Sequence, residues 1–441
     1  MRTETIKTIV LTILVATSLL LTFAIWNYQP QLDVLEDGDN YLKGDTRISG
    51  EQKSLNTLVK PSQVIFHEGG STYAMDSYNT SMDMYTTFQG WRLIDFQSVS
   101  KNKVNRESSV EIIFPTSLPL SILVNTLTVN EDEDVPKYMV DRIFVDISSA
   151  NSNNHVHFYS DENEQMYQAT TENINPYTEY LPLINDTGSH VEHLSINEKR
   201  ENPIYIPAGE VKVPKFSFFR DELAIEPMVN VLFNDRNKVL KKTPTNGESY
   251  YIDDYRQLAI SEPNRYMRFT YNSPSEQEAS ETMTRADVIK ESQSFINDHY
   301  GWTDNYVISH MNSTGSTVQY RIHQNGYPVF NDAGLSVMEQ SWRNKELYSY
   351  NRSLVQFDTE IDSNSPAVTL MSGADVKQRM ENKIEQYPLL VEDIRIGYTM
   401  IQKENEYEVV FSLQPAWYYK TVGGGWKLLK ESELVNKGGV Q

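Results

Sequence analysis

At 441 residues the chain is long enough for two or three domains, and its 39% hydrophobic content suits a globular body with a core. The formal net charge is −21 at pH 7, and so acidic a surface repels nucleic acid and anionic lipid. There is no cysteine, which excludes disulfide bonds, thiolate catalysis and metal sites with cysteine ligands.

The first predicted element is the uncharged stretch TIVLTILVATSLLLTFAIW at 8–26. As a helix it spans about 28 Å, close to the hydrocarbon thickness of a membrane. Arg2 and Lys7 precede it, so the positive-inside rule keeps residues 1–7 in the cytoplasm and puts the following body outside. No A-x-A-like cleavage site follows the stretch. The sequence therefore predicts a retained single-pass anchor in the cell membrane.

Small residues recur on two sides of this predicted helix. Thr8, Thr12 and Ala16 are spaced every four residues and share one face, while Ser18 and Thr22 lie on another. Small side chains let helix backbones approach closely, which makes these five residues candidates for contact with other membrane helices. Alternatively, the hydroxyl groups only bond the carbonyls one turn before them. The sequence leaves both interpretations open.

Residues 27–60 are predicted to be a solvated linker, because they carry glycines and many charges but little apolar periodicity. Within them, DGDN at 37–40 has residue types found in calcium loops. Its ligand spacing fails, however, and no glutamate stands at the twelfth position. We therefore expect linker rather than a metal site.

An N-terminal α+β domain is expected at 61–185. Gly69-Gly70 lies between two strand-like runs, which predicts a hairpin. The spacing of apolar residues in YNTSMDMYTTFQGW predicts a helix that ends at Gly90, and a short helix is expected near 116–125. Strands are predicted for the alternating runs RLIDFQSV, SSVEIIFP, DRIFVDIS, HVHFY and QMYQAT.

A central α+β domain is expected at 186–275, where turn residues separate short strands. The predicted strands are PIYIP, VKVPKFSFF, ESYYIDD and NRYMRFTYN, and EPMVNVLFND is a short helical piece.

Two similar helix starts mark the last section. TRADV recurs as SGADV 88 residues later, and in each copy Asp stands at the third helical position. Thr284 with Asp287, and Ser372 with Asp375, therefore predict two capping boxes in which Asp takes the usual Glu or Gln role.

Each of these helices is followed by predicted antiparallel strands. We therefore expect a C-terminal α+β domain at 276–441 with an internal helix–sheet repeat, at 284–360 and 372–430. The predicted fold class is α+β: an N-terminal transmembrane helix, then a multi-domain extracytoplasmic body of antiparallel sheets with packed helices.

The sequence offers no catalytic constellation. His155 and His157 would share one strand face, and His190 and His193 could share one helical turn, but neither pair has a third ligand in register. Signatures of metalloproteases, serine hydrolases and phosphate-binding loops are missing from the sequence. We expect no enzyme and assign no catalytic, cofactor-binding or metal-binding residue.

Aromatic residues suggest a different class of function. The chain has 27 Tyr and 6 Trp, and two segments, QNGYPVFNDAG and LQPAWYY, concentrate them. Tyr327, Phe330, Trp417, Tyr418 and Tyr419 are therefore candidates for a surface that binds glycan or peptide. Alternatively, they pack the helices onto the sheets, because alternating aromatic residues suit strands.

The same two segments, together with the opening TETIKTIVLTILVATSLLLTFAIWNYQP, resemble the YycH family of Gram-positive bacteria. The resemblance extends over essentially the whole chain. It implies a non-enzymatic regulator of the sensor histidine kinase YycG, also called WalK, which controls cell-wall metabolism. It also implies a YycI-type partner, with one membrane helix and one extracytoplasmic body in each protein, and a body of three domains.

This resemblance leads to the leading hypothesis of a membrane-anchored signalling regulator that acts through its helix and its body. The alternatives are an anchored binder of wall glycan or peptide, and an anchored hydrolase. A glycan binder predicts exposed, coplanar aromatic rings, whereas a hydrolase predicts a cleft with convergent histidines and carboxylates.

Overall fold

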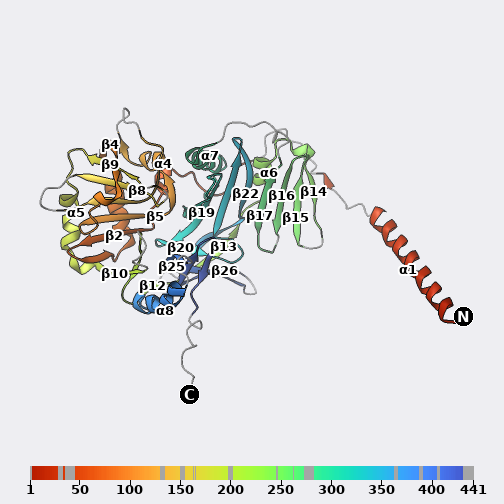
Figure 1. Ribbon diagram of the computed structural model, residues 1–441. Helices are drawn as coiled ribbons and strands as arrows, with labels where there is room; N and C mark the ends of the chain where they lie inside the picture. The colour runs from red at the N-terminus through yellow and green to blue at the C-terminus, as the bar shows by residue number, and fades with distance from the viewer. Residues whose placement is uncertain are drawn as a thin grey trace, which may run out of the picture.

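The fold was determined as a computed structural model of the 441-residue chain. Its α+β class is as predicted, with mostly antiparallel sheets and packed helices (Figure 1). The structure describes all residues except 1, 28–32, 35–44, 130–134, 149–153, 162, 164, 197–201, 245–246, 262, 273–282, 362–365, 387–390, 405–407 and 431–441.

The chain begins with the long helix α1 (Arg2–Asn27), which lies apart from the body in Figure 1. Its apolar part, Ile6–Phe23, has a mean hydropathy of 2.1 and is not buried against the body. In the described part of the chain, this is the one helix long and apolar enough to cross a membrane.

A first sheet of ten strands forms one end of the body (Figure 1). Its strands are β2 (Gln63–Glu68), β3 (Ser71–Met75), β4 (Arg92–Ser100), β5 (Ser109–Pro119), β6 (Thr128–Val129), β7 (Met139–Asp146), β8 (His155–Tyr159), β9 (Gln165–Thr171), β10 (His190–Ile196) and β11 (Ile204–Pro207). Their order is β11-β10-β3-β2-β5-β7-β8-β9-β4-β6. The accompanying helices are α3 (Tyr78–Gln89), α4 (Leu120–Val124), α5 (Pro176–Asn185) and the 3₁₀ turns η1 (Lys101–Lys103) and η2 (Thr187–Ser189).

Local signals explain the two larger helices of this part. The Ser77 side chain caps α3, which buries Tyr85 and Phe88 and ends at Gly90 as expected. Asn175 caps α5, where a proline occupies the first helical position. Gly69-Gly70 forms the expected hairpin turn between β2 and β3.

The strands β10 and β11 belong to this first sheet, because β10 pairs with β3 from His190 to Glu192. The expected domain boundary at residue 185 thus falls inside a continuous sheet. Residues 186–275 form no sheet of their own in the described chain, since their later strands join the second sheet.

The second sheet has 15 strands among the described residues. They are β1 (Asp33–Val34), β13 (Phe216–Glu222), β14 (Leu240–Lys242), β15 (Glu248–Ile252), β16 (Arg256–Ser261), β17 (Tyr266–Tyr271), β18 (Tyr306–Met311), β19 (Thr317–Gln324), β20 (Tyr327–Phe330), β21 (Val337–Arg343), β22 (Glu346–Ser353), β23 (Val355–Glu360), β25 (Val391–Glu404), β26 (Val409–Thr421) and β27 (Trp426–Leu428). The main path is β1-β14-β15-β16-β17-β22-β21-β19-β20-β25-β26-β13-β23, with β18 on β19 and β27 on β26.

The remaining elements belong to neither large sheet, and α8 contacts β10 of the first one. They are the pair β12 (Val211–Pro214) and β24 (Ala367–Leu370), the helices α6 (Glu226–Leu232), α7 (Arg285–Asp298) and α8 (Gly373–Gln386), and the 3₁₀ turn η3 (Arg236–Lys238).

Both expected helix starts carry their capping contacts. At α7 the Thr284 side chain accepts a bond from the Asp287 backbone, and the Asp287 side chain accepts one from the Thr284 backbone. At α8 the Ser372 hydroxyl accepts the Asp375 N–H and donates to its carboxylate. Antiparallel strands follow each helix along the chain, and the parallel pair β20–β25 links the strands after α7 to those after α8. The internal repeat stays a prediction.

Part of the predicted linker is packed rather than solvated. Residues 45–60, here called the strap, contain the short helix α2 (Leu55–Leu58) and bury Ile48, Leu58 and Val59. The Ile48 N–H donates to the His299 carbonyl at the end of α7. The linker prediction was therefore wrong for this segment, because its few apolar residues find a tertiary partner. The DGDN segment at 37–40 lies outside the described residues.

Candidate functional site

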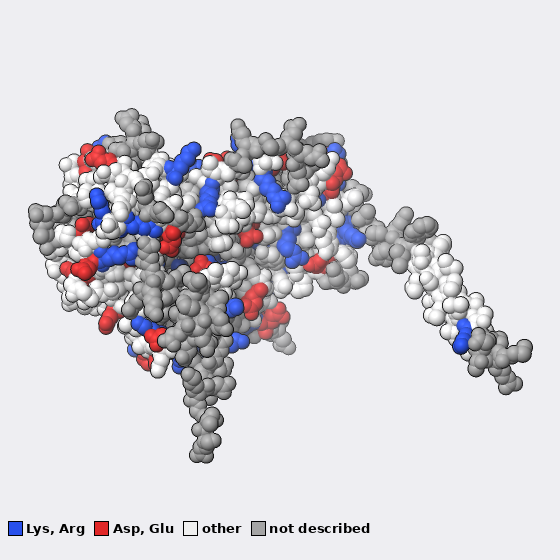
Figure 2. Space-filling view, in the orientation of Figure 1, with Lys and Arg blue, Asp and Glu red and all other residues white. Residues whose placement is uncertain are grey.

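The threonine hydroxyls of α1 bond within the helix itself. Thr12 donates to the Thr8 carbonyl at 2.8 Å and Thr22 to the Ser18 carbonyl at 2.9 Å. These bonds satisfy the hydroxyls internally, as the second of the two interpretations expected. Ala16 and the threonine methyl groups then form a face of small side chains. Packing of that face against other helices stays a prediction. Figure 2 shows the described part of α1 as an almost uncharged rod beside a body of mixed charge.

The strap fixes the chain that follows α1 to the second sheet. The short strand β1 pairs with β14, and the strap then runs along the end of α7. The Lys53 N–H donates to Asn297 Oδ1 at 2.8 Å, Lys53 Nζ donates to the Asp304 carbonyl at 2.8 Å, and Gln293 Nε2 donates to the Lys53 carbonyl at 2.7 Å. Burial lowers the pKa of Lys53. After α1, the described chain therefore contacts the second sheet before it enters the first.

Beneath the strap lies a buried cluster of charged and polar groups. Arg352 is fully buried and donates to the Gly301 carbonyl at 2.8 Å and to Thr303 Oγ1 at 3.1 Å. The adjacent Asp304 carboxylate accepts the Phe357 N–H at 3.0 Å. Burial raises the pKa of Asp304 to about 6, although Arg352 and Lys53 oppose that rise. The cluster ties the strap to the end of α7 and to β22 and β23.

The raised pKa of Asp304 predicts a specific pH dependence. Because its folded-state pKa lies above the value of about 4 in unfolded chains, stability from this group is present below pH 4 and is lost as the pH rises through 6. The wild-type protein should lose about 2 kcal/mol of its free energy of unfolding between pH 4 and pH 6 through this group, and D304N should not show this loss. Urea denaturation of the full chain in detergent at pH 4 and pH 8 measures it, with D298N at an exposed position as the control. Equal pH dependence in D304N and wild type would contradict the account.

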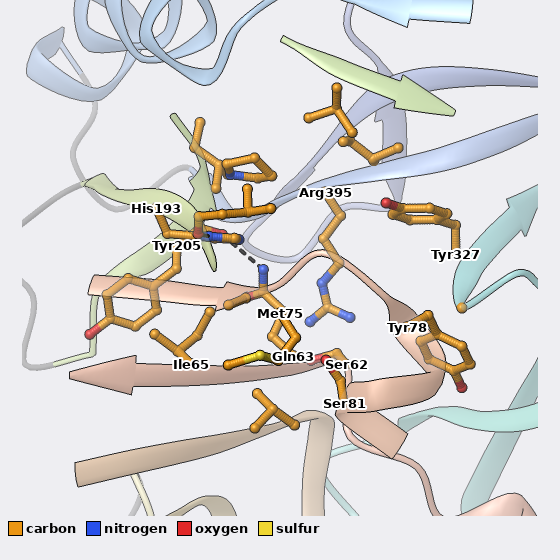
Figure 3. A pocket seen from close by; sticks show the side chains of 18 of the residues that line it. Ser62, Gln63, Ile65, Met75, Tyr78, Ser81, His193, Tyr205, Tyr327 and Arg395 are labelled. Atoms are coloured by element: carbon orange, nitrogen blue, oxygen red, sulfur yellow. Dashed lines mark hydrogen bonds between the residues drawn. The ribbon is translucent and has the colours of Figure 1, made fainter. Parts of the chain in front are cut away.

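A cavity of about 180 Å³ lies between the two sheets (Figure 3). The first sheet contributes Gln63, His193 and Tyr205, and the second contributes Tyr327 and Arg395. Gln63 Nε2 donates to the Tyr205 carbonyl at 3.0 Å, and the Arg395 guanidinium points into the space in Figure 3. The lining is mainly apolar, so this small cavity resembles a gap between packed units more than a catalytic cleft.

The turn before β20 closes one side of this small cavity. Gly326 has a φ of 81°, and a Cβ at this position would clash with the ring of Tyr78 on α3. A further bond joins the sheets where the Met311 N–H donates to Thr116 Oγ1 at 3.2 Å. The two sheets thus meet through specific close contacts.

The expected aromatic platform is not exposed. Phe330, Trp417, Tyr418 and Tyr419 are buried, with exposed fractions of 7, 3, 4 and 8%. Phe330 stacks on Tyr418 with ring centroids 4.0 Å apart, and Trp417 Nε1 donates to the Met371 carbonyl. This corrects the prediction of these four residues as a binding surface, because they pack the strands and helices together.

Tyr327 is the exception among the five, since it is half-buried and lines the small cavity. Its ring contacts Tyr398 edge-on, at 6.2 Å between centroids.

The histidine pairs are placed differently from one another. His155 and His157 lie on β8 with ring centroids 6.1 Å apart, and burial lowers the pKa of His157 to about 4. His190 and His193 lie on the strand β10, so the expected helical turn was wrong and the strand turns them to opposite faces. In the described part of the chain, no group of three or more potential ligands could hold a metal.

Comparisons with known proteins identify the family. Models of the YycH protein match along the chain, the N-terminal domain at residues 4–179 and the C-terminal domain at 201–437. The chain belongs to the YycH family. A relative from Bacillus subtilis (strain 168), the two-component system WalR/WalK regulatory protein YycH, is 21% identical over 450 residues, which cover 96% of each chain.

The YycH fold is confirmed by a solved structure. The crystal structure of YycH from Bacillus subtilis superposes with a TM-score of 0.70 at 18% identity, and covers 88% of this chain and all of that one. The resemblance drawn from the anchor and the two aromatic segments was therefore correct.

Several buried charged residues of this YycH family member were not predicted from the sequence. Lys53, Asp304 and Arg352 form the buried cluster under the strap, and Arg395 reaches into the small cavity. The local signal for the arginines is a single charge within a predicted strand, as in YNRS and IRIG. That pattern equally fits an exposed face.

Proposed function

We propose that this chain is a membrane-anchored, non-enzymatic regulator of a WalK-type sensor histidine kinase, also called YycG, and works with a YycI-type partner. The observation that carries the proposal is family membership over nearly the whole chain. The relative named a WalR/WalK regulatory protein matches this chain over 96% of the length of each. The apolar helix α1, with Arg2 and Lys7 in its N-terminal part, supports a single span with the N-terminus in the cytoplasm.

In this proposal α1 packs beside the membrane helices of the kinase and of the partner. Thr8, Thr12 and Ala16 form the contact face, and Ser18 and Thr22 form a second one. Because the hydroxyls of Thr12 and Thr22 already bond to helix carbonyls, close van der Waals packing is the expected source of affinity. A contact that differs between two kinase states by about 1–3 kcal/mol would shift the equilibrium between these states by about 5- to 150-fold.

The strap connects the body to α1 along the chain. Its bonds to α7 and the pairing of β1 with β14 connect the extracytoplasmic chain to the second sheet close to the anchor. Binding of the body to the partner or to the kinase would thereby act on the position of α1. The direction of the effect, activation or repression, follows from which kinase state the contact favours.

Single substitutions in α1 test the contact face. A16L adds bulk to the small face, whereas V10L adds one methylene group about 120° away around the helix. We expect A16L to shift the output of a kinase-controlled promoter most of the way to the deletion phenotype, and V10L to leave it near wild type. The amount of protein in the membrane is measured in parallel by immunoblot. Equal outputs from the two variants would argue against a specific face.

The alternative of a surface-anchored glycan or peptide binder has less support. Four of its five candidate aromatic residues are buried, so they offer no exposed stacking platform.

A further inference from the structure

A second and larger space separates the two sheets. This large cleft has a volume of about 750 Å³, within the range of pockets that hold small-molecule ligands. The first sheet contributes the end of β5 and residues near Pro203, and the second contributes β18, β19, β25 and the turn from β26 to β27. It shares Gln63, Pro328 and Arg395 with the small cavity, so the two spaces are neighbours.

The charge in the large cleft differs from that of the rest of the molecule. The chain carries a net charge of −21, yet the cleft lining holds more basic than acidic side chains. The basic residues are Arg142, Arg285, Arg321, Arg395 and Lys420, and the acidic ones are Asp141, Asp161, Glu392 and Asp393. The lining therefore carries a small formal excess of positive charge in an otherwise acidic protein, and the basic group without an acidic partner decides where an anion could bind.

Most of these basic groups already have acidic partners. Lys420 Nζ lies 2.9 Å from Glu392 Oε1, and Arg395 Nη2 lies 2.5 Å from Asp393 Oδ2. Arg142 pairs with Glu111, which lies outside the cleft. Arg395 keeps a buried Nε that has no hydrogen-bond partner among the described residues. This Nε is not accessible from the cleft, so Arg395 contributes to this wall the positive charge of its guanidinium rather than an unused donor.

Arg321 has no acidic partner in the described part of the chain. It lies on β19, where alternate side chains pack toward α7, as the bond from Tyr320 to Ser292 shows. Arg321 itself faces the cleft, donates one bond from Nη1 to the Val329 carbonyl at 3.0 Å, and lies over the Phe330 ring at 4.7 Å. Burial lowers the pKa of Arg321 to about 10, which reflects a charge held without compensation.

Two aromatic rings lie beside Arg321 and Arg395. Phe330 is near both Arg321 and the Trp426 ring, with 5.4 Å between the centroids of Phe330 and Trp426. The Arg395 guanidinium lies 5.6 Å from the centroid of Trp426. Trp426 also lines the cleft and is half-buried. Guanidinium donors beside an aromatic face suit an oxyanion attached to an apolar or sugar-like ring.

We propose that the large cleft binds a small oxyanionic ligand, a carboxylate or a phosphate, through Arg321, beside the positive charge of Arg395 and the ring of Trp426. A planar guanidinium can donate two parallel bonds to either kind of oxyanion. The ligand would fill a space walled by both sheets and would stabilise their present arrangement. The inference goes beyond the proposed function and does not rest on it, because it concerns only the body.

The test is ligand-induced thermal stabilisation of the full-length protein in detergent. Inorganic phosphate and glucuronate serve as probes at constant ionic strength, with sodium chloride as the reference. The variants are R321M, which removes the charge but keeps an aliphatic side chain, and R343M, the same change at an exposed arginine outside the cleft. R321K retains a charge and checks that the site tolerates substitution.

We expect at least one probe to raise the melting temperature of wild type and R343M, with affinity about tenfold weaker in R321M and intermediate in R321K. A response to phosphate alone assigns phosphate, and a response to glucuronate alone assigns carboxylate. Loss of an unpaired buried charge should leave the R321M fold intact. Two results would overturn the proposal: no shift of the wild-type protein at millimolar probe, or an equal shift in R321M and wild type.

Discussion

E111Q is expected to destabilise the body by about 3–5 kcal/mol, because it breaks a buried ion pair and leaves Arg142 unpaired. Glu111 is fully buried on β5 in the middle of the first sheet. One carboxylate oxygen pairs with Arg142 on β7, and the other lies 2.9 Å from His67 Nε2 on β2. The substitution keeps the shape of the side chain and removes only its charge.

The pH dependence of this effect has a definite sign. Burial alone would raise the pKa of Glu111, but Arg142 and His67 lower it to about 2. A depressed carboxyl pKa stabilises the fold above the unfolded value near pH 4, and this stabilisation is lost as the pH falls toward 2. The gap in stability between wild type and E111Q should therefore be widest at pH 7 and narrow below pH 4.

Urea denaturation of the full chain in detergent, followed by far-ultraviolet circular dichroism, measures this gap. E107Q is the matched control, because Glu107 is exposed just before β5. If E111Q proved as stable as E107Q at pH 7, the buried pair would contribute nothing to the stability of the first sheet.

Elements with strong local signals were predicted well from the sequence. The α3 helix with its stop at Gly90, the hairpin at Gly69-Gly70 and both capping boxes depend on residues close together in the chain. The long apolar helix α1 was equally clear, because its hydropathy needs no tertiary context.

Features that depend on distant partners were missed. Ile48 and Lys53 look like linker residues until α7 is placed beside them. His190 and His193 are three residues apart, which suggested a helical turn, but pairing of β10 with β3 made the segment a strand. Such pairing overrides local preference, since the sheet gains its stability from neighbours that the local sequence does not contain.

The two spaces between the sheets were also beyond the sequence. Gln63 and Arg395 line both spaces although more than 300 residues separate them in the chain. For the aromatic segments, the sequence predicted a binding surface that the structure does not have. Phe330 and Tyr418 were predicted to form a surface, but each packs on the other, from the strands β20 and β26 on either side of β25. Composition alone does not distinguish an aromatic platform from an aromatic core.

Exchange of the whole anchor is expected to have the largest effect on signalling. Residues 8–26 are replaced by a helix of leucines of equal length, which preserves the span but removes every small residue of the two faces. If α1 contacts the kinase specifically, the body alone would not restore regulation, because the contact that distinguishes kinase states is lost.

A second variant supplies the matched control. The leucine helix regains Thr8, Thr12 and Ala16, and with them the small face alone. We expect this restored face to recover most of the regulation. Recovery would assign the effect to these three positions rather than to a general property of the natural anchor.

The most direct measurement is the output of a promoter controlled by the kinase's response regulator, in cells with wild-type protein, leucine anchor, restored face or full deletion. Equal amounts of protein in the membrane are verified by immunoblot. The account predicts that the leucine anchor matches the deletion and that the restored face approaches wild type. Wild-type output from the leucine anchor would contradict it and reduce α1 to a tether.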